Sequence, residues 1–122
     1  MTRDPYGEAL RAYFSNPAHA GDIGGGTEVR VDDQGVRIQL ALAHAGGRIE
    51  SLRWRAWGCP HLLAACEAFC SEFEGRGCAE LLEFSGSDLM QTLAIPVEKT
   101  GRILVLEDAI RSLGNTACAP AG

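Results

Sequence analysis

The sequence predicts an α+β fold in which helices cover one face of a three-stranded antiparallel sheet. Between residues 27 and 57 apolar and polar residues alternate, the pattern of strands with one buried face. From Gly58 onward the period changes to about 3.6 residues, that of amphipathic helices. At 122 residues the chain is long enough for a core of its own. We therefore expect a single domain over residues 1–122, with a disordered tail from about residue 115 to 122.

The first half of the chain is expected to form a short helix and then the sheet. Asp4 followed by Pro5 is typical of a helix start, and the sequence Ser-Asn-Pro at 15–17 ends this helix. Residues 18–26 are rich in glycine and predict a flexible loop. Alternating patterns predict the strands, which we place at 27–31, 36–42 and 48–58.

Helices are expected throughout the second half. Pro60 suits the first turn of a helix that ends at Gly75. Two short helices follow at 78–84 and 87–93, and Gly114 is expected to close a final helix that begins at Arg102.

The overall charge and hydropathy narrow the function classes. A net charge of −5 argues against nucleic acid as the partner, because phosphate binding rests on an excess of Lys and Arg. No apolar run approaches the roughly 20 residues that span a bilayer, and residues 1–10 lack the apolar stretch of a signal peptide. We expect a cytoplasmic protein that does not contact membrane, in which the five cysteines are free thiols or metal ligands.

Cys59 is the strongest candidate for chemistry. A thiol where a strand gives way to a helix N-terminus lies near unpaired N–H groups and the positive end of the helix dipole, which lower its pKa. The alternative is an inert, half-buried cysteine. His61 follows two residues later, and a solvent-exposed or capping role is favoured over a metal-ligand role, since a Cys-x-His pair is a weak metal signal.

The remaining cysteines and tryptophans favour structural roles. Cys66 and Cys70 lie one helical turn apart, which permits metal binding. They also fall on the apolar stripe of the helix, and core packing is the favoured interpretation. Trp54 is predicted to fill the core, and Trp57, on the opposite face of its strand, is predicted to be exposed beside the site.

Four stretches together resemble the IscU family, which also occurs as the N-terminal domain of NifU and assembles iron–sulfur clusters. They read YGEALRAYFSNPAHAG, IESLRWRAWGC, EGRGCAELLEFSGSDL and LEDAIRSLG. In their order and separation they cover nearly the whole chain. The resemblance implies the fold predicted above, with cysteine desulfurase or other iron–sulfur assembly proteins as partners.

The resemblance also implies where a cluster would bind. In the family, three cysteines and a neighbouring histidine or aspartate hold it. The middle cysteine corresponds to Cys59, the first to Asp33, and the histidine–cysteine pair to Gly101 and Arg102. A protonated arginine has no lone pair to donate to iron, and clusters are held mainly by thiolates. Cys59, Asp33 and His61 are the plausible metal ligands that should converge, and Arg102 is expected to stabilise anionic sulfur.

Three functions stay open at this point. The first is a non-enzymatic assembly scaffold with a divergent ligand set, which binds iron, zinc or an iron–sulfur cluster, or carries sulfur, through Cys59. A homodimer, a partner or a small thiol could supply the missing ligands. The second is an interaction protein that binds no metal and regulates a cysteine desulfurase. The third, less favoured, is a sulfur-transfer or redox enzyme that uses Cys59 alone.

Overall fold

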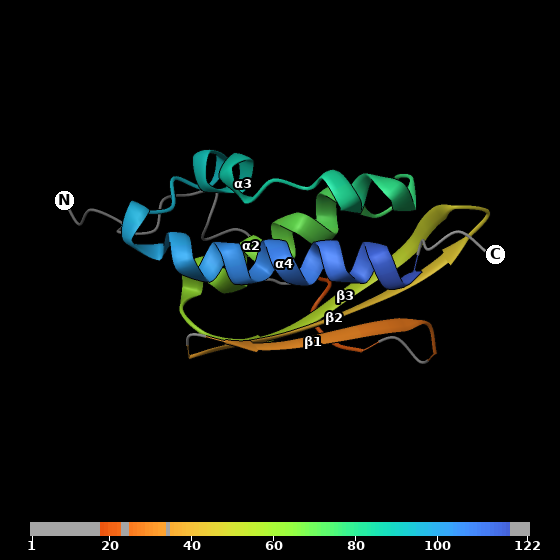
Figure 1. The fold of residues 1–122 in the computed structure, drawn as a ribbon, viewed down its shortest axis with the longest axis horizontal. Coiled ribbons are helices and arrows are strands. Elements are labelled where there is room, and N and C mark those ends of the chain that lie inside the picture. The colour runs from red at the N-terminus through yellow and green to blue at the C-terminus, as the bar shows by residue number, and fades with distance from the viewer. Residues whose placement is uncertain (1–17, 23–24, 34, 118–122) are drawn as a thin grey trace.

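A three-stranded antiparallel sheet lies under a layer of helices in the computed structural model, which describes residues 18–22, 25–33 and 35–117 (Figure 1). The strands are β1 (Thr27–Asp33), β2 (Val36–Ala45) and β3 (Arg48–Trp57), and they lie side by side in this order. The predicted fold class is therefore confirmed. The helix predicted to begin at Asp4 lies outside the described residues.

The register of the sheet brings the predicted site to one end of it. Asp33, at the end of β1, pairs with Val36, and Arg37 pairs with Trp57 at the end of β3. The β1–β2 turn and the β3–α2 junction therefore lie at the same end, with β2 between them. Since neighbouring strands are about 4.8 Å apart, roughly 10 Å separates the two outer strands there.

One face of the sheet carries the helices. They are α2 (Pro60–Phe73), the 3₁₀ helix η1 (Cys78–Glu83), α3 (Gly86–Thr92), the 3₁₀ helix η2 (Val97–Lys99) and α4 (Thr100–Ala117). α4 packs on β1 and β2, and α2 packs on β3. α3 and η1 then lie against α4 (Figure 1).

The core forms between the sheet and these helices. Ile38, Leu40 and Leu42 alternate along β2 and are fully buried, as a strand with one covered face requires. Cys66 and Cys70 on α2 are also fully buried. Their predicted packing role is confirmed, because both belong to the hydrophobic cluster beneath α2.

The final helix differs from its prediction at both ends. α4 begins at Thr100 and runs to Ala117, so residues 115–117 are helical and do not belong to a tail. Gly114 does not close the helix. It is buried, and a Cβ atom added there would lie 2.9 Å from Cβ of Leu81 on η1. This glycine therefore permits the close approach of α4 and η1.

We expect Gly114→Ala to lower the free energy of unfolding by about 1–3 kcal/mol, the usual cost of overpacking. Alanine is about 1 kcal/mol better than glycine inside a helix on propensity alone, so steric conflict with Leu81 must outweigh this gain. Urea unfolding followed by circular dichroism measures the change. Asn115→Ala, at the neighbouring exposed position, should be neutral or stabilising. Equal stabilisation by both substitutions would refute the close-packing role.

The segment at 19–21 is not the flexible loop that its glycines predicted. The Trp54 backbone N–H donates to the His19 carbonyl at 3.0 Å, and the Gly21 N–H donates to the Trp54 carbonyl at 2.9 Å. These residues form a parallel bridge along β3. They therefore cover the edge of the sheet that β2 does not occupy.

A buried carboxylate fastens this segment to α2. Glu67 is 3 % exposed, and it accepts hydrogen bonds from Trp54 Nε1 at 3.0 Å, from the His19 backbone N–H at 2.8 Å and from Ser71 Oγ at 3.1 Å. His19 Nδ1 lies 2.5 Å from Glu67, and His19 Nε2 lies 3.3 Å from Glu74. The histidine thus bridges two carboxylates.

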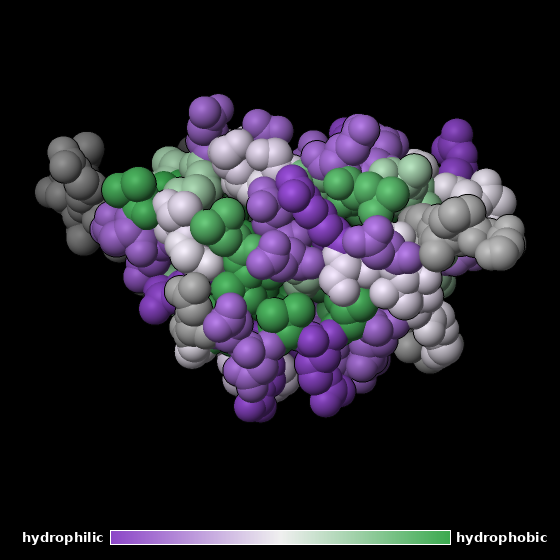
Figure 2. All heavy atoms as spheres, viewed as in Figure 1, coloured by the Kyte–Doolittle hydropathy of each residue, from purple (hydrophilic) through white to green (hydrophobic). Residues whose placement is uncertain are grey.

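On the face that α4 presents, hydrophobic residues are exposed between hydrophilic ones (Figure 2). The exposed large apolar residues include Leu104 on α4 and Val97 on η2. Within the described ranges, no helix has both the length and the apolar character that crossing a bilayer requires.

Candidate functional site

Cys59 occupies the junction between β3 and α2. It is the N-cap residue of α2, with φ −80° and ψ 164°, and its carbonyl accepts hydrogen bonds from the N–H groups of Leu62 and Leu63 at 3.0 and 3.2 Å. Pro60 follows at the first helical position, where its missing N–H costs nothing. The thiol is free and partly exposed. It is therefore open to reaction and not sealed in the core.

The surroundings of Cys59 favour its thiolate form. Partial burial would raise the pKa of the thiol. The Leu62 N–H, a hydrogen bond from the Arg102 side chain, the His61 N–H and the charge of Arg102 outweigh burial, so the pKa lies below its ordinary value. The structure places Arg102, from the first turn of α4, beside Cys59, at the position that the resemblance implied.

Replacing Arg102 with methionine should raise the pKa of Cys59, because the substitution removes both the hydrogen bond and the positive charge. The pH dependence of iodoacetamide alkylation, read by mass spectrometry at Cys59, measures this pKa. The wild-type midpoint should lie below the free-cysteine reference of about 8.5, and Arg102→Met should move it upward. Arg30→Met, at an exposed arginine on β1, is the control. An unchanged midpoint in Arg102→Met would contradict the assignment.

His61 is buried, with 8 % of its surface exposed, so the predicted solvent-exposed position is wrong. Its pKa is lowered first by burial and then by the charge of Lys99, with a smaller contribution from Arg102, while Glu98 opposes them. These three charged residues belong to η2 and the start of α4. The charges that act on the imidazole therefore come from that segment, and the lowered pKa favours the neutral ring.

Asp33 reaches the same end of the sheet as Cys59 but does not join it in a ligand group. It is exposed at the end of β1, on the far side of β2. Among residues 18–22, 25–33 and 35–117, no group of three or more His, Cys, Asp or Glu side chains is placed to hold a metal ion. Asp33, Cys59 and His61 are all described, so their predicted convergence does not appear within one chain.

A cluster does not fit the donors that the described part of the chain supplies at this junction. Cys59 gives one thiolate, and the residue beside it, Arg102, is a cation that cannot donate to iron. Iron–sulfur clusters are held mainly by thiolates. Any cluster or metal ion bound at Cys59 would need ligands from outside the described residues.

The remaining described cysteines divide into two kinds. Cys66 and Cys70 are free and buried, and burial raises the pKa of both thiols well above the ordinary value. Both are therefore unreactive. Cys78, on η1, is disulfide-bonded, which corrects the expectation that every cysteine would be a free thiol or a metal ligand. Sequence spacing could not show this, because pairing depends on how distant segments meet.

The two tryptophans lie as predicted. Trp54 is buried with 5 % of its surface exposed, and Trp57 is 55 % exposed. The Arg37 guanidinium lies 5.7 Å from the centre of the Trp57 ring, so the cationic neighbour comes from β2. Trp57 thus offers an exposed aromatic surface two residues before Cys59.

Sequence reasoning missed the polar groups that fix the sheet edge behind this junction. Glu67 and His19 were given no role, although an acidic residue inside the apolar stripe of α2 was a usable signal. A buried carboxylate requires partners. The residues that supply them come from β3 and from the segment at 19–21.

Comparison with solved structures identifies the fold. The N-terminal part of a NifU-like protein from Brucella abortus superposes with a TM-score of 0.74, at 11 % sequence identity, over 94 % of this chain and 95 % of that one. The structure of a proposed iron–sulfur cluster assembly scaffold protein of the SUF system, from Fervidobacterium islandicum, superposes with a TM-score of 0.69, at 12 % identity, over 89 % and 96 %. The chain therefore has the fold of NifU N-terminal structures.

Sequence comparison also finds similarity to a NifU protein, over part of a longer chain. The chain is 29 % identical over 96 residues to the bifunctional protein NifU/MnmA of Rubrobacter xylanophilus. The match covers 75 % of this chain and 20 % of that protein, so the chain spans about a fifth of its relative. No protein-family model matches. The chain is thus NifU N-terminal-like by structure and by distant sequence similarity.

Proposed function

We propose that this protein is a non-enzymatic component of iron–sulfur cluster assembly that accepts sulfur on Cys59. The observation that carries the proposal is the partly exposed Cys59 thiol, whose pKa is lowered at the N-terminus of α2 beside Arg102. The NifU-like fold supports the proposed role in iron–sulfur cluster assembly. The partner proposed from the same resemblance is a cysteine desulfurase, which carries sulfur as a cysteine persulfide.

The transfer requires only the Cys59 thiolate and the persulfide of the desulfurase. The Cys59 thiolate attacks the outer sulfur of the desulfurase persulfide, and the S–S bond of that persulfide breaks. The desulfurase cysteine leaves with the electron pair as a thiolate, and Cys59 becomes the persulfide. The exchange is neutral in electrons. The role proposed for Arg102 is to stabilise the anionic sulfur before and after transfer, in the way a cation lowers a thiol pKa.

The test is sulfur transfer from the cysteine desulfurase encoded in the same genome, supplied with L-cysteine. Under non-reducing conditions the wild-type protein should gain the mass of one sulfur atom, located on Cys59 by peptide mass spectrometry. Cys59→Ser should gain none. Cys66→Ala is the matched control, because its thiol is buried, and it should behave as wild type. Equal sulfur gain by Cys59→Ser, or none by wild type, would reject the sulfur-carrier role.

Metal binding is the part of the proposal that needs donors beyond the residues that the structure describes in one chain. Asp33 and His61 remain proposed ligands, but they do not converge with Cys59 among the described residues, so a second subunit or a partner is proposed to complete the set. Iron, zinc and acid-labile sulfide should be measured in anaerobically purified wild type and in Cys59→Ser, together with the oligomeric state. Stoichiometric metal that is lost in Cys59→Ser would support a scaffold. Metal-free protein would leave Cys59 as a sulfur carrier alone.

A second candidate function is regulation of the desulfurase without metal or sulfur binding. The observation that favours it is the single thiolate in a place where the resemblance implies three. This candidate predicts that wild type and Cys59→Ser bind the desulfurase with equal affinity and change its cysteine turnover equally. Isothermal titration and a sulfide-release assay measure the two quantities. Lost turnover control in Cys59→Ser, with binding intact, would favour the sulfur carrier instead.

A further inference from the structure

Cys78, the first residue of η1, forms a bond that sulfur transfer through Cys59 does not use. It is disulfide-bonded, and only 2 % of its surface is exposed. Cys59, Cys66 and Cys70 are free thiols. Among the five cysteines of the sequence, this leaves Cys118 as the partner that the chain itself can supply. Cys118 lies outside the described residues and follows the last residue of α4 in the sequence.

Contacts between described residues lead from η1 to the end of α4. Three of them join α4 to the segment that runs from η1 to α3, and they are Gly86 with Glu107, Phe84 with Arg111, and Leu81 with Gly114. The two segments are therefore antiparallel, because each step toward the end of α4 is a step toward the start of η1. The same progression brings the turn that follows Gly114 to Cys78.

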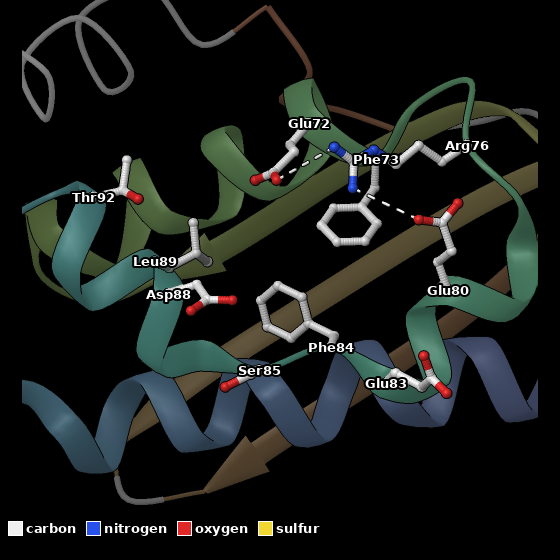
Figure 3. Close-up of a pocket in the computed structure, with 10 residues that line it drawn as sticks. All are labelled: Glu72, Phe73, Arg76, Glu80, Glu83, Phe84, Ser85, Asp88, Leu89 and Thr92. Atoms are coloured by element: carbon white, nitrogen blue, oxygen red, sulfur yellow. Dashed lines mark ion pairs between the residues drawn. The ribbon is translucent and has the colours of Figure 1, made fainter.

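The start of η1 is fixed on its other sides. The Cys78 N–H donates to the Gly47 carbonyl in the β2–β3 turn at 2.7 Å. Arg76, two residues earlier, pairs with Glu72 at 3.6 Å and with Glu80 at 3.7 Å, and Figure 3 shows it between these two carboxylates. The β2–β3 turn and the end of α4 lie at the same end of the molecule (Figure 1). Cys78 thus offers a fixed anchor for the end of α4.

We propose that Cys118 is the partner of Cys78 and that their disulfide is a redox-sensitive clamp, which holds the end of α4 on η1. The packing of Gly114 against Leu81 does not depend on this bond. The reduced protein therefore keeps its fold and loosens at the last turn of α4. This role is independent of sulfur acceptance on Cys59.

Closing the clamp needs a two-electron oxidant, which a small disulfide such as oxidised glutathione supplies. Because Cys78 is buried, the Cys118 thiolate attacks first. The S–S bond of the small disulfide breaks, and one small thiolate leaves with the electron pair. The Cys78 thiolate then attacks the Cys118 sulfur, and the second small thiolate leaves. Two protein thiols are oxidised and one small disulfide is reduced to two thiols, which take up the two protons.

Peptide mapping tests the bond. Trypsin separates the two cysteines, because residues 77–99 and 112–122 each form one peptide with a single cysteine. Full-length protein equilibrated with oxidised glutathione and then alkylated at its free thiols should yield these two peptides joined, and dithiothreitol should release them. Cys118→Ser should give no joined peptide. Cys59→Ser is the matched control, and it should give as much joined peptide as wild type.

Hydrogen exchange tests the clamp. When the wild type is reduced with dithiothreitol, amide exchange at residues 114–117 of α4 should accelerate at least about tenfold, because a disulfide typically contributes more stability than this factor represents. Exchange at residues 103–106 of the same helix should change little. Cys118→Ser should exchange at the faster rate with or without dithiothreitol.

Three results would overturn the proposal. Oxidised wild type might yield no joined peptide, or residues 77–99 might be joined to the peptide of residues 56–76, which holds the other three described cysteines. Joined peptides found only in covalent dimers on a non-reducing gel would place the bond between two copies of the chain. Equal exchange at residues 114–117 before and after reduction would show that the bond does not hold the end of α4.

Discussion

Glu67→Ala is expected to lower the free energy of unfolding by roughly 2–4 kcal/mol, because it strands buried donors without a partner. Trp54 Nε1 and the His19 backbone N–H both donate to this carboxylate, and His19 Nδ1 lies against it. Alanine satisfies none of them. Urea unfolding measures the loss, and it is large against a typical total of about 5–15 kcal/mol.

The same substitution should release the segment at 19–21 from the sheet edge. Hydrogen exchange at the Gly21 amide, which donates to the Trp54 carbonyl, should accelerate far more than exchange within β2. Glu72→Ala is the control, since this exposed carboxylate on the same helix makes only a surface ion pair with Arg76, worth up to about 1 kcal/mol. If both variants lost the same stability, Glu67 would not be the fastening point.

Low pH should reduce the stability of the fold through the Glu67 carboxylate. Burial would raise the pKa of Glu67, but hydrogen bonds from Trp54 and His19 outweigh it and the pKa is lowered. A lowered folded-state pKa gives stability that is present above the unfolded value, about 4.3 for Glu, and is lost as the pH falls through the folded value. Glu67→Gln should therefore lose less stability than wild type when the pH is lowered below about 4.3.

Phe69→Ala is expected to cost about 3–5 kcal/mol, as is usual when a buried aromatic ring is removed from a core. Phe69 is fully buried, and its ring contacts those of Phe73 and Phe84. The cavity would lie beside the rings of Phe73 and Phe84. Chemical unfolding measures the effect.

Leu82→Ala is the matched control, because this apolar side chain on η1 is 40 % exposed. It should cost much less than Phe69→Ala. A cost below about 1 kcal/mol for Phe69→Ala would show that the three rings do not act as a packed unit.

Local features of the chain were predicted well from sequence. The alternation along β2 and β3 fixed which residues face the helices, so Trp54 is buried and Trp57 exposed. The burial of Cys66 and Cys70 was predicted from the apolar stripe of α2. These features depend on the spacing of neighbouring residues, which the sequence displays directly.

Features that depend on distant segments were predicted less well. Gly114 was interpreted as a helix end because glycine commonly ends helices, but it lies where α4 approaches η1. His61 was expected at the surface, yet it is buried, and charged residues of η2 and the start of α4 act on its pKa. Each error arose because a segment distant in the sequence packs against the residue, and the local pattern of residues does not reveal such a contact.

By itself, then, the sequence determined the sheet, the helix that follows it and the thiol at their junction, because periodicity and helix-start chemistry are local properties of the chain. Tertiary structure decided what surrounds that thiol. It brought Arg102 from α4 to Cys59 and buried His61, and it joined Glu67 to His19. Side-chain neighbours are set by how whole elements pack, and packing depends on shape and charge contributed from the entire fold.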